Sequence, residues 1–181
     1  MFNATFLVVG ESGSGKDTIV NKLVKDKGIR RIDSYTTRPR RNDEDRHIFE
    51  TSYYQWILKN PDESIIGYTE FDGHIYWATA SQLEQNDVYI IDPDGVRFLR
   101  NAYRGNKPVK VIYLNVPAYV RIKRMLKRGD GLRKTIKRFL QDDNKFIGAM
   151  QMADYVISDG SIDSMANQLW EYMSKFQEEI K

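Results

Sequence analysis

Short apolar runs alternate with segments of helical apolar spacing along most of this chain. The runs are short, rich in β-branched residues and bounded by turn residues, as buried strands are. They cover residues 5–9, 29–34, 88–92, 109–114 and 155–158. Helical spacing occurs in residues 16–26, 94–103, 117–128, 133–150 and 162–180. Because strands that alternate with helices form a parallel sheet covered on both faces, the pattern predicts an α/β fold of three layers.

The alternation is interrupted between residues 47 and 80. This segment is rich in aromatic residues and has short β-like pieces around a turn at Asp72-Gly73. A small inserted subdomain explains the change better than a continued alternation, and residues 42–45 before it are expected to form a loop. We expect the aromatic residues to form the core of the insert, with Tyr68 and Trp77 as candidates for an additional role in stacking on a ligand.

Composition adds few constraints. The 181 residues fit one domain, and 41% hydrophobic and 29% charged residues are typical of a water-soluble globular protein. No apolar run approaches the roughly 20 residues of a membrane span, and no leader pattern opens the sequence. The lack of cysteine excludes disulfides and is compatible with a reducing cytoplasm, where we expect the protein to act as a monomer or homodimer. A net charge of +3 does not argue for a nucleic-acid partner.

One stretch carries the chemistry. It follows the first apolar run, precedes the first helical segment and reads Gly10-Glu11-Ser12-Gly13-Ser14-Gly15-Lys16-Asp17-Thr18. Strand, glycine-rich turn and helix are the context of a phosphate-binding loop, in which backbone N–H groups and the helix N-terminus hold phosphates and a lysine reaches the β- and γ-phosphates. We interpret the stretch as a binding site for a nucleoside triphosphate.

Candidate metal ligands lie near this loop. Asp17 stands where Ser or Thr usually binds Mg²⁺, so either Asp17 holds the metal through a water or Thr18 supplies the hydroxyl. Asp92 closes a predicted strand at the same edge of the sheet, where an acidic residue often contacts the metal and its waters. Asp92 is equally well explained as a turn residue before Pro93.

Two basic clusters suggest further phosphate contacts. Arg38, Arg40 and Arg41 follow the hydroxyls of residues 34–37, and guanidinium forks with hydroxyls suit a phosphate, although a solvated basic loop has the same composition. A longer basic segment is split by Gly129-Asp130-Gly131, which suits a hinged lid over the triphosphate. An exposed pair of charged helices is the alternative.

Taken together, these landmarks resemble the guanylate kinase family over nearly the whole chain. The matching stretches are residues 10–18, Ser34 to Arg38 with Arg41, residues 70–76, Ile91-Asp92 with Gly95-Val96, Arg124, Arg128-Gly129 and Arg138. The resemblance implies a P-loop NTPase fold, with core residues 1–34, 81–124 and 139–181. It also implies a monophosphate-binding insert over residues 35–80 and a lid over residues 125–138.

The implied reaction is Mg²⁺-dependent phosphoryl transfer from ATP to a nucleoside monophosphate, with GMP or dGMP as the expected acceptor. Residues 10–18 and Arg124 are then expected to bind ATP. The residues expected to bind the monophosphate are Ser34, Arg38, Arg41, His47, Glu70 and Tyr76. Those expected to act in catalysis are Lys16, Arg38, Asp92, Arg128 and Arg138, and those near the metal are Asp17, Thr18 and Asp92.

The sequence departs from the family pattern in the base pocket. Gly67, Ala78 and Ile90 replace an expected glutamate, a small hydroxyl residue and an acidic residue, and Glu70, Asp72 or Thr79 are candidates to substitute for them. His47 replaces a tyrosine, and the lid is one residue shorter than usual. Two other functions stay open: a related kinase for another deoxynucleotide or for ribose 1,5-bisphosphate, and a non-catalytic guanylate-kinase-like binding module.

Overall fold

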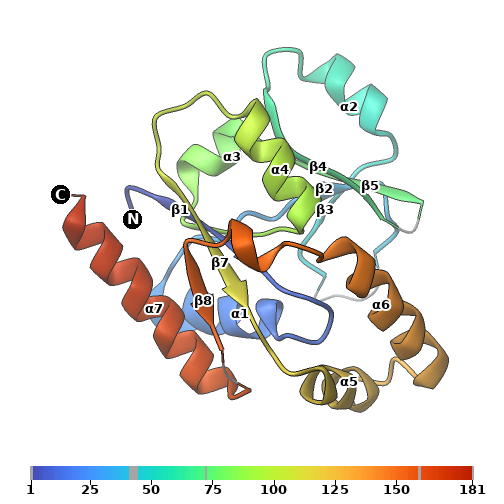
Figure 1. Cartoon of the computed structure of the whole chain (residues 1–181). Helices are drawn as coiled ribbons and strands as arrows, with labels where there is room; N and C mark the ends of the chain where they lie inside the picture. The colour runs from blue at the N-terminus through green and yellow to red at the C-terminus, as the bar shows by residue number, and fades with distance from the viewer. Residues whose placement is uncertain (1, 41–44, 72, 159, 181) are drawn as a thin grey trace.

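The computed structural model describes residues 2–40, 45–71, 73–158 and 160–180, and it contains two sheets (Figure 1). The larger one has the strand order β6-β1-β7-β8, and every pairing in it is parallel. Its strands are β1 (Thr5–Val9), β6 (Val88–Ile90), β7 (Val109–Leu114) and β8 (Tyr155–Ile157). All five residues of β1 are buried, as expected of a central strand that helices cover on both faces.

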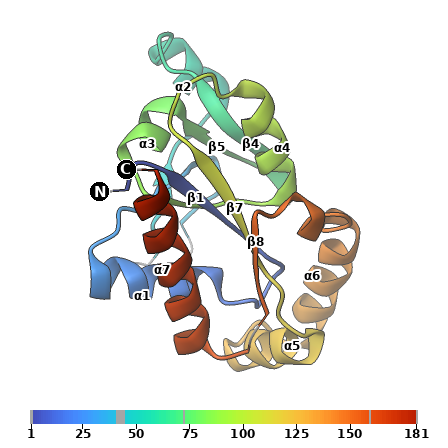
Figure 2. The ribbon, with the colours of Figure 1, turned by 60° about the vertical axis from the view of Figure 1, so that its left-hand side comes forward.

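Alternate side chains of β1 enter two separate cores. Phe6 and Val8 pack with residues of α1 (Lys16–Lys27) and α7 (Ile162–Glu179). Leu7 and Val9 pack with residues of α3 (Ala80–Gln85) and α4 (Pro93–Ala102). Figures 1 and 2 show these helix pairs on opposite sides of the sheet, which confirms the predicted three-layer α/β fold.

The second sheet is formed by residues 35–79 and has the order β3-β2-β5-β4. Its strands are β2 (Tyr35–Thr36), β3 (Ile48–Phe49), β4 (Ile65–Phe71) and β5 (His74–Thr79), and the short helix α2 (Tyr53–Lys59) packs beside them. Trp77 is fully buried and contacts the rings of Tyr35, Tyr53 and Trp56. Trp77 therefore belongs to the core of the insert and has no surface left for stacking on a base.

The remaining helices are α5 (Ala118–Lys127), α6 (Leu132–Lys145) and the 3-10 turn η1 (Met150–Met152). Gly129 and Gly131 separate α5 from α6 and have φ angles of 87° and 70°, which breaks the helix where the sequence predicts a break. Among the described residues, no helix combines the length and the apolar composition that crossing a bilayer requires.

Some predicted elements were wrong. Residues 29–34 form only one bridge, Arg31 to Val88, because the N–H of Arg30 bonds to the Asp87 side chain instead of extending a ladder. The basic helix ends at Lys145 and not at residue 150, and Gly148 follows with a φ of 73° that a helix does not allow. The sequence analysis also missed α2 and α3, whose first turns are capped by Ser52 and Thr79.

Candidate active site

The glycine-rich loop joins the end of β1 to the first turn of α1. Gly13 and Gly15 have φ angles of 78° and 96°, in the left-handed region that favours glycine. A Cβ atom on Gly13 would lie 2.5 Å from the carbonyl oxygen of Arg121, so this position also lacks room for a side chain. The loop is thus held in one path by its own backbone and by α5.

Lys16 points back over the loop. Its Nζ donates to the carbonyl oxygens of Gly10 and Glu11, at 2.5 and 3.1 Å. Burial lowers the pKa of Lys16, while the charge of Asp17 and of other nearby carboxylates opposes that shift. A cationic lysine beside a glycine-rich loop and the N-terminus of a helix is suited to binding phosphate oxygens.

A cavity of about 630 Å³ lies along this loop, and residues of the lid form its other wall. Arg124 donates to the carbonyl oxygen of Ser14 at 2.9 Å and also to that of Gly160, and thereby joins α5 to the loop. Many of the residues that were predicted to bind ATP or to act on its phosphates line this cavity. They are Ser12, Gly13, Gly15, Lys16, Asp17, Thr18, Arg124, Arg128 and Arg138.

The lid cations gather around one carboxylate. Asp130 is hydrogen-bonded to Arg128, and its oxygens lie 3.4 Å from Arg138 and 3.8 Å from Lys134. Burial raises the pKa of Asp130, but the bond to Arg128 and the positive charges around it outweigh this and hold the pKa below its usual value. A ligand phosphate that enters the cavity is an alternative partner for Arg128 and Arg138.

A second cavity, of about 230 Å³, lies between the loop and the second sheet. Ser34, His47 and Tyr76 line it together with Lys16. Arg38 instead lines a neighbouring cavity of about 290 Å³, which shares Tyr76 with the 230 Å³ cavity. Four of the predicted monophosphate residues, Ser34, Arg38, His47 and Tyr76, thus line these two adjoining cavities; Arg41 lies outside the described residues.

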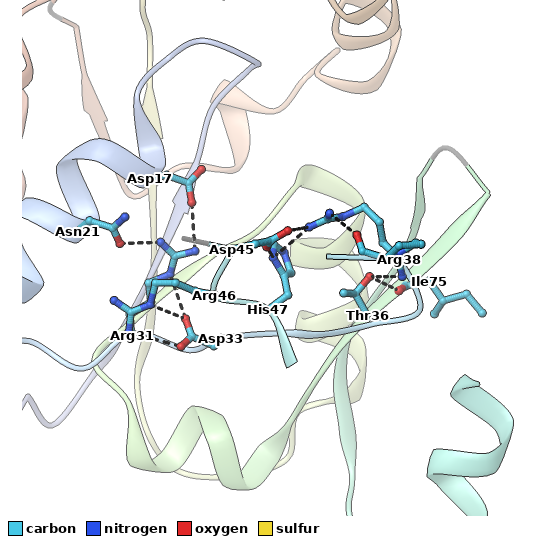
Figure 3. A network of polar contacts seen from close by, with 11 residues as sticks. Asp17, Asn21, Arg31, Asp33, Thr36, Arg38, Asp45, Arg46, His47 and Ile75 are labelled. Atoms are coloured by element: carbon cyan, nitrogen blue, oxygen red, sulfur yellow. Dashed lines mark hydrogen bonds and ion pairs between the residues drawn. The ribbon is translucent and has the colours of Figure 1, made fainter. Parts of the chain in front are cut away.

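Arg38 is held by an ion pair (Figure 3). Its side chain is 7% exposed, and its Nη2 lies 2.7 Å from one oxygen of Asp45. The other oxygen of Asp45 lies 2.7 Å from Nδ1 of His47. The Asp45 carboxylate therefore pairs with both Arg38 and His47, two of the residues that were predicted to bind the acceptor phosphate.

Comparison with known proteins agrees with this arrangement. The guanylate kinase family model matches residues 3–176. The chain belongs to the guanylate kinase family. It is 27% identical to the guanylate kinase of Paraburkholderia xenovorans and 28% identical to that of Mycoplasma genitalium, with 91% of this chain covered and 76% and 72% of those proteins. Guanylate kinase membership makes this chain a nucleoside monophosphate kinase and a nucleotide-binding transferase.

Solved structures show the same fold. The guanylate kinase of Anaplasma phagocytophilum superposes with a TM-score of 0.64 at 16% identity, covering 97% of this chain and 87% of that one. A protein from Eubacterium ventriosum superposes with a TM-score of 0.56 at 11% identity, covering 96% and 99%. At these identities the likeness concerns the fold.

The structure corrects the role predicted for Glu70. Thr69 and Phe71 line the second cavity, of about 230 Å³. Because side chains alternate along a strand, Glu70 points to the opposite face of β4. There it accepts a hydrogen bond from Tyr68, and Tyr68 itself contacts Phe98 of α4. Neither Glu70 nor Tyr68 lines the second cavity. Of the other candidate substitutes, Thr79 caps α3 and Asp72 lies outside the described residues.

Asp92, which was predicted to contact the metal and its waters, is engaged by three other groups. One of its oxygens accepts a hydrogen bond from the N–H of Gly95 at 2.7 Å and so caps α4. The other accepts from the hydroxyl of Thr69 at 2.8 Å and lies 2.6 Å from Nζ of Lys145. Asp92 is therefore the N-cap of α4, directly before Pro93, and an ion-pair partner of Lys145.

Two residues of α6 reach the site that the sequence analysis did not single out. Asp142 accepts from the N–H of Ser12 at 2.7 Å and lies 3.9 Å from Arg121, so it fixes the glycine-rich loop to α6. Lys145 reaches Asp92 from the end of the same helix. The spacing of Arg138, Asp142 and Lys145, four and three residues apart, places all three on one helix face and was a usable signal.

Proposed function

We propose that this guanylate kinase transfers the γ-phosphoryl group of ATP to a nucleoside monophosphate, with GMP or dGMP as the expected acceptor. We call the 630 Å³ cavity, in which ATP would bind, the donor cavity, and the 230 Å³ cavity, in which the monophosphate would bind, the acceptor cavity. The observation that carries the proposal is that Lys16 and Ser12 line both of them. The two substrates would therefore meet at the loop that binds the transferred phosphate. This is the geometry that a direct transfer between two bound nucleotides requires.

Different residues of the chain bind the two substrates and stabilise the transferring group. The N–H groups of the loop and Lys16 hold the donor phosphates, while Ser34, His47, Tyr76 and Arg38 orient the acceptor. An oxygen of the acceptor phosphate forms a bond to the γ-phosphorus, and the bond from that phosphorus to the β–γ bridging oxygen breaks. Because charge spreads over the transferring group, Lys16, Arg128 and Arg138 stabilise it electrostatically, and closure of the lid excludes water.

The donor set fits Mg²⁺. Mg²⁺ prefers oxygen ligands, keeps several waters and is usually held by one or two carboxylates together with substrate phosphates. The Asp17 carboxylate and the Thr18 hydroxyl both line the donor cavity beside Lys16, whereas Asp92 is engaged by other groups. Asp17 and Thr18 would hold the metal, which when bound neutralises charge on the phosphates. Arg31 lies 3.1 Å from Asp17 and competes for its carboxylate (Figure 3).

The test is consumption of ATP in the presence of Mg²⁺ with GMP, dGMP, AMP, CMP, UMP, dTMP and ribose 1,5-bisphosphate as acceptors. The Lys16→Ala variant is expected to lose about 100-fold or more in turnover, as removal of a transition-state contact does. Lys110→Ala is the matched control, because Lys110 pairs with Asp154 outside both cavities. Turnover with ribose 1,5-bisphosphate alone would replace the proposed acceptor. Nucleotide binding without turnover on any acceptor would instead indicate a non-catalytic module.

A further inference from the structure

One end of the acceptor cavity is formed by a cluster that links three elements. Thr69 comes from β4, Asp92 from the start of α4 and Lys145 from the end of α6, and all three line the cavity. The Lys145 ammonium lies 2.6 Å from Asp92 and 3.4 Å from the Thr69 hydroxyl, and its side chain is 17% exposed. It also lies 5.3 Å from the centre of the Phe71 ring.

Hydrogen-bond capacity decides what this cluster offers to a ligand. Asp92 already accepts from Gly95 and Thr69 and is neutralised by Lys145, so three of the roughly four acceptor positions of its carboxylate are engaged. An ammonium has three N–H donors. Among the described residues, Asp92 and Thr69 are its partners within hydrogen-bonding distance, which leaves one donor for a ligand.

Asp142 of α6 also lines the cavity, and its carboxylate accepts from Ser12 and pairs with Arg121. Tyr89 is buried against Gly67, where a Cβ atom would lie 3.0 Å from the tyrosine oxygen, and so a longer side chain at position 67 has no room. Ile90 and Phe146 supply apolar surface. A ligand group that reaches this end therefore meets a cationic donor in largely apolar surroundings.

We propose that Lys145 determines acceptor specificity by donating to a carbonyl oxygen on the base. The inference rests on the proposed nucleoside monophosphate kinase function. It selects the oxo bases, namely guanine, hypoxanthine, uracil and thymine, over adenine and cytosine. An amino group in the same place would direct its N–H bonds at the Lys145 ammonium, which cannot accept a hydrogen bond, and unpaired buried donors are strongly disfavoured.

The test uses two ligand pairs that exchange an oxo for an amino group: IMP against AMP, and UMP against CMP. Equilibrium binding is measured by calorimetry without ATP, and initial rates are measured with ATP and Mg²⁺. We expect the oxo member of each pair to bind at least about tenfold more tightly, as a specific base contact provides. In Lys145→Met this ratio is expected to fall to about one while the KM for ATP stays unchanged, since a lost base contact affects only its own ligand.

Two further variants separate specificity from folding. Lys145→Arg keeps the cationic donor and is expected to retain the oxo preference. Lys110→Met removes a lysine from an ion pair with Asp154 outside the cavity and is expected to leave the ratio unchanged. Equal binding of IMP and AMP by the native protein would overturn the inference without any variant, even if both nucleotides are phosphorylated.

Different results would refute the proposed phosphoryl transfer and the specificity role of Lys145. Oxo-selective binding that depends on Lys145, without phosphoryl transfer to any monophosphate, would support the specificity role and refute the kinase activity. Rapid transfer with no difference within either pair would do the reverse. The lack of binding to all four monophosphates and to GMP and dGMP would overturn both.

Discussion

Arg38 allows the acceptor site to be tested separately from the donor site. Its guanidinium is buried, donates to the carbonyl oxygen of Pro39 at 2.9 Å and pairs with Asp45 at 2.7 Å. It lines the 290 Å³ cavity, which Tyr76 also lines, and it does not line the 630 Å³ cavity along the glycine-rich loop. We therefore expect Arg38→Ala to weaken acceptor binding and to leave ATP binding close to that of the native enzyme.

The expected magnitude follows from the contacts. A hydrogen bond to a charged group contributes about 1.5–3 kcal/mol, so losing the contact to the acceptor phosphate should raise its dissociation constant roughly 10- to 150-fold. Stability should fall as well, because Asp45 stays buried without its cation. Breaking a buried pair costs about 3–5 kcal/mol, and we expect the lower end since His47 still faces Asp45.

The assay combines calorimetric titration of ATP and of the preferred acceptor with urea denaturation. The double variant Arg38→Ala/Asp45→Ala should recover part of the lost stability, because no carboxylate is left unpaired, but it should not recover acceptor affinity. Arg40→Ala is the control, since Arg40 is an exposed neighbour that stacks on Phe49. Equal weakening of ATP and acceptor, or recovery of acceptor affinity in the double variant, would refute the assignment of Arg38.

Two further substitutions test the framework of the site. Gly73→Ala should cost about 1–2 kcal/mol, because Gly73 has a positive φ but nothing within 4 Å of an added Cβ atom. Gly13→Ala should lower the free energy of unfolding by more than this, because Gly13 also has a positive φ and its Cβ atom would meet a backbone oxygen. Equal losses in urea denaturation would show that the loop adjusts. Asp87→Asn should cost about 1–3 kcal/mol at pH 7, because the buried Asp87 accepts from the N–H groups of Phe2 and Arg30 and pairs with the Arg30 guanidinium. Burial raises the pKa of Asp87, but these bonds hold it below the usual value, so its stabilisation is complete above about pH 4 and is lost as the pH falls through the lowered pKa. The difference between native and variant unfolding free energies should therefore shrink at acid pH, and a constant difference would contradict the assignment.

Local features were read correctly because they depend on neighbours in the chain. The glycine-rich loop, the central strand and the break at Gly129 to Gly131 each depend on a few consecutive residues whose backbone preferences agree. The longer helical segments were found from apolar spacing, because one face of an amphipathic helix packs on the core, whereas the short helices α2 and α3 were not found. The edge segment at residues 29–34 was misread because a side chain, Asp87, takes the backbone donor that a ladder would have used.

The sequence by itself determined where phosphates bind: a strand, a glycine-rich turn and a lysine dictate that site through backbone geometry alone. Only the tertiary structure decided what else reaches it. Asp142 contacts Ser12 across 130 positions of sequence, and Lys145 meets Asp92 because α6 docks against the start of α4. Such pairings depend on how helices pack over a sheet, and the spacing of Asp142 and Lys145 along α6 does not name the residues that they meet. The groups proposed to hold phosphate are thus found in the sequence, whereas the group proposed to contact the base is found in the fold.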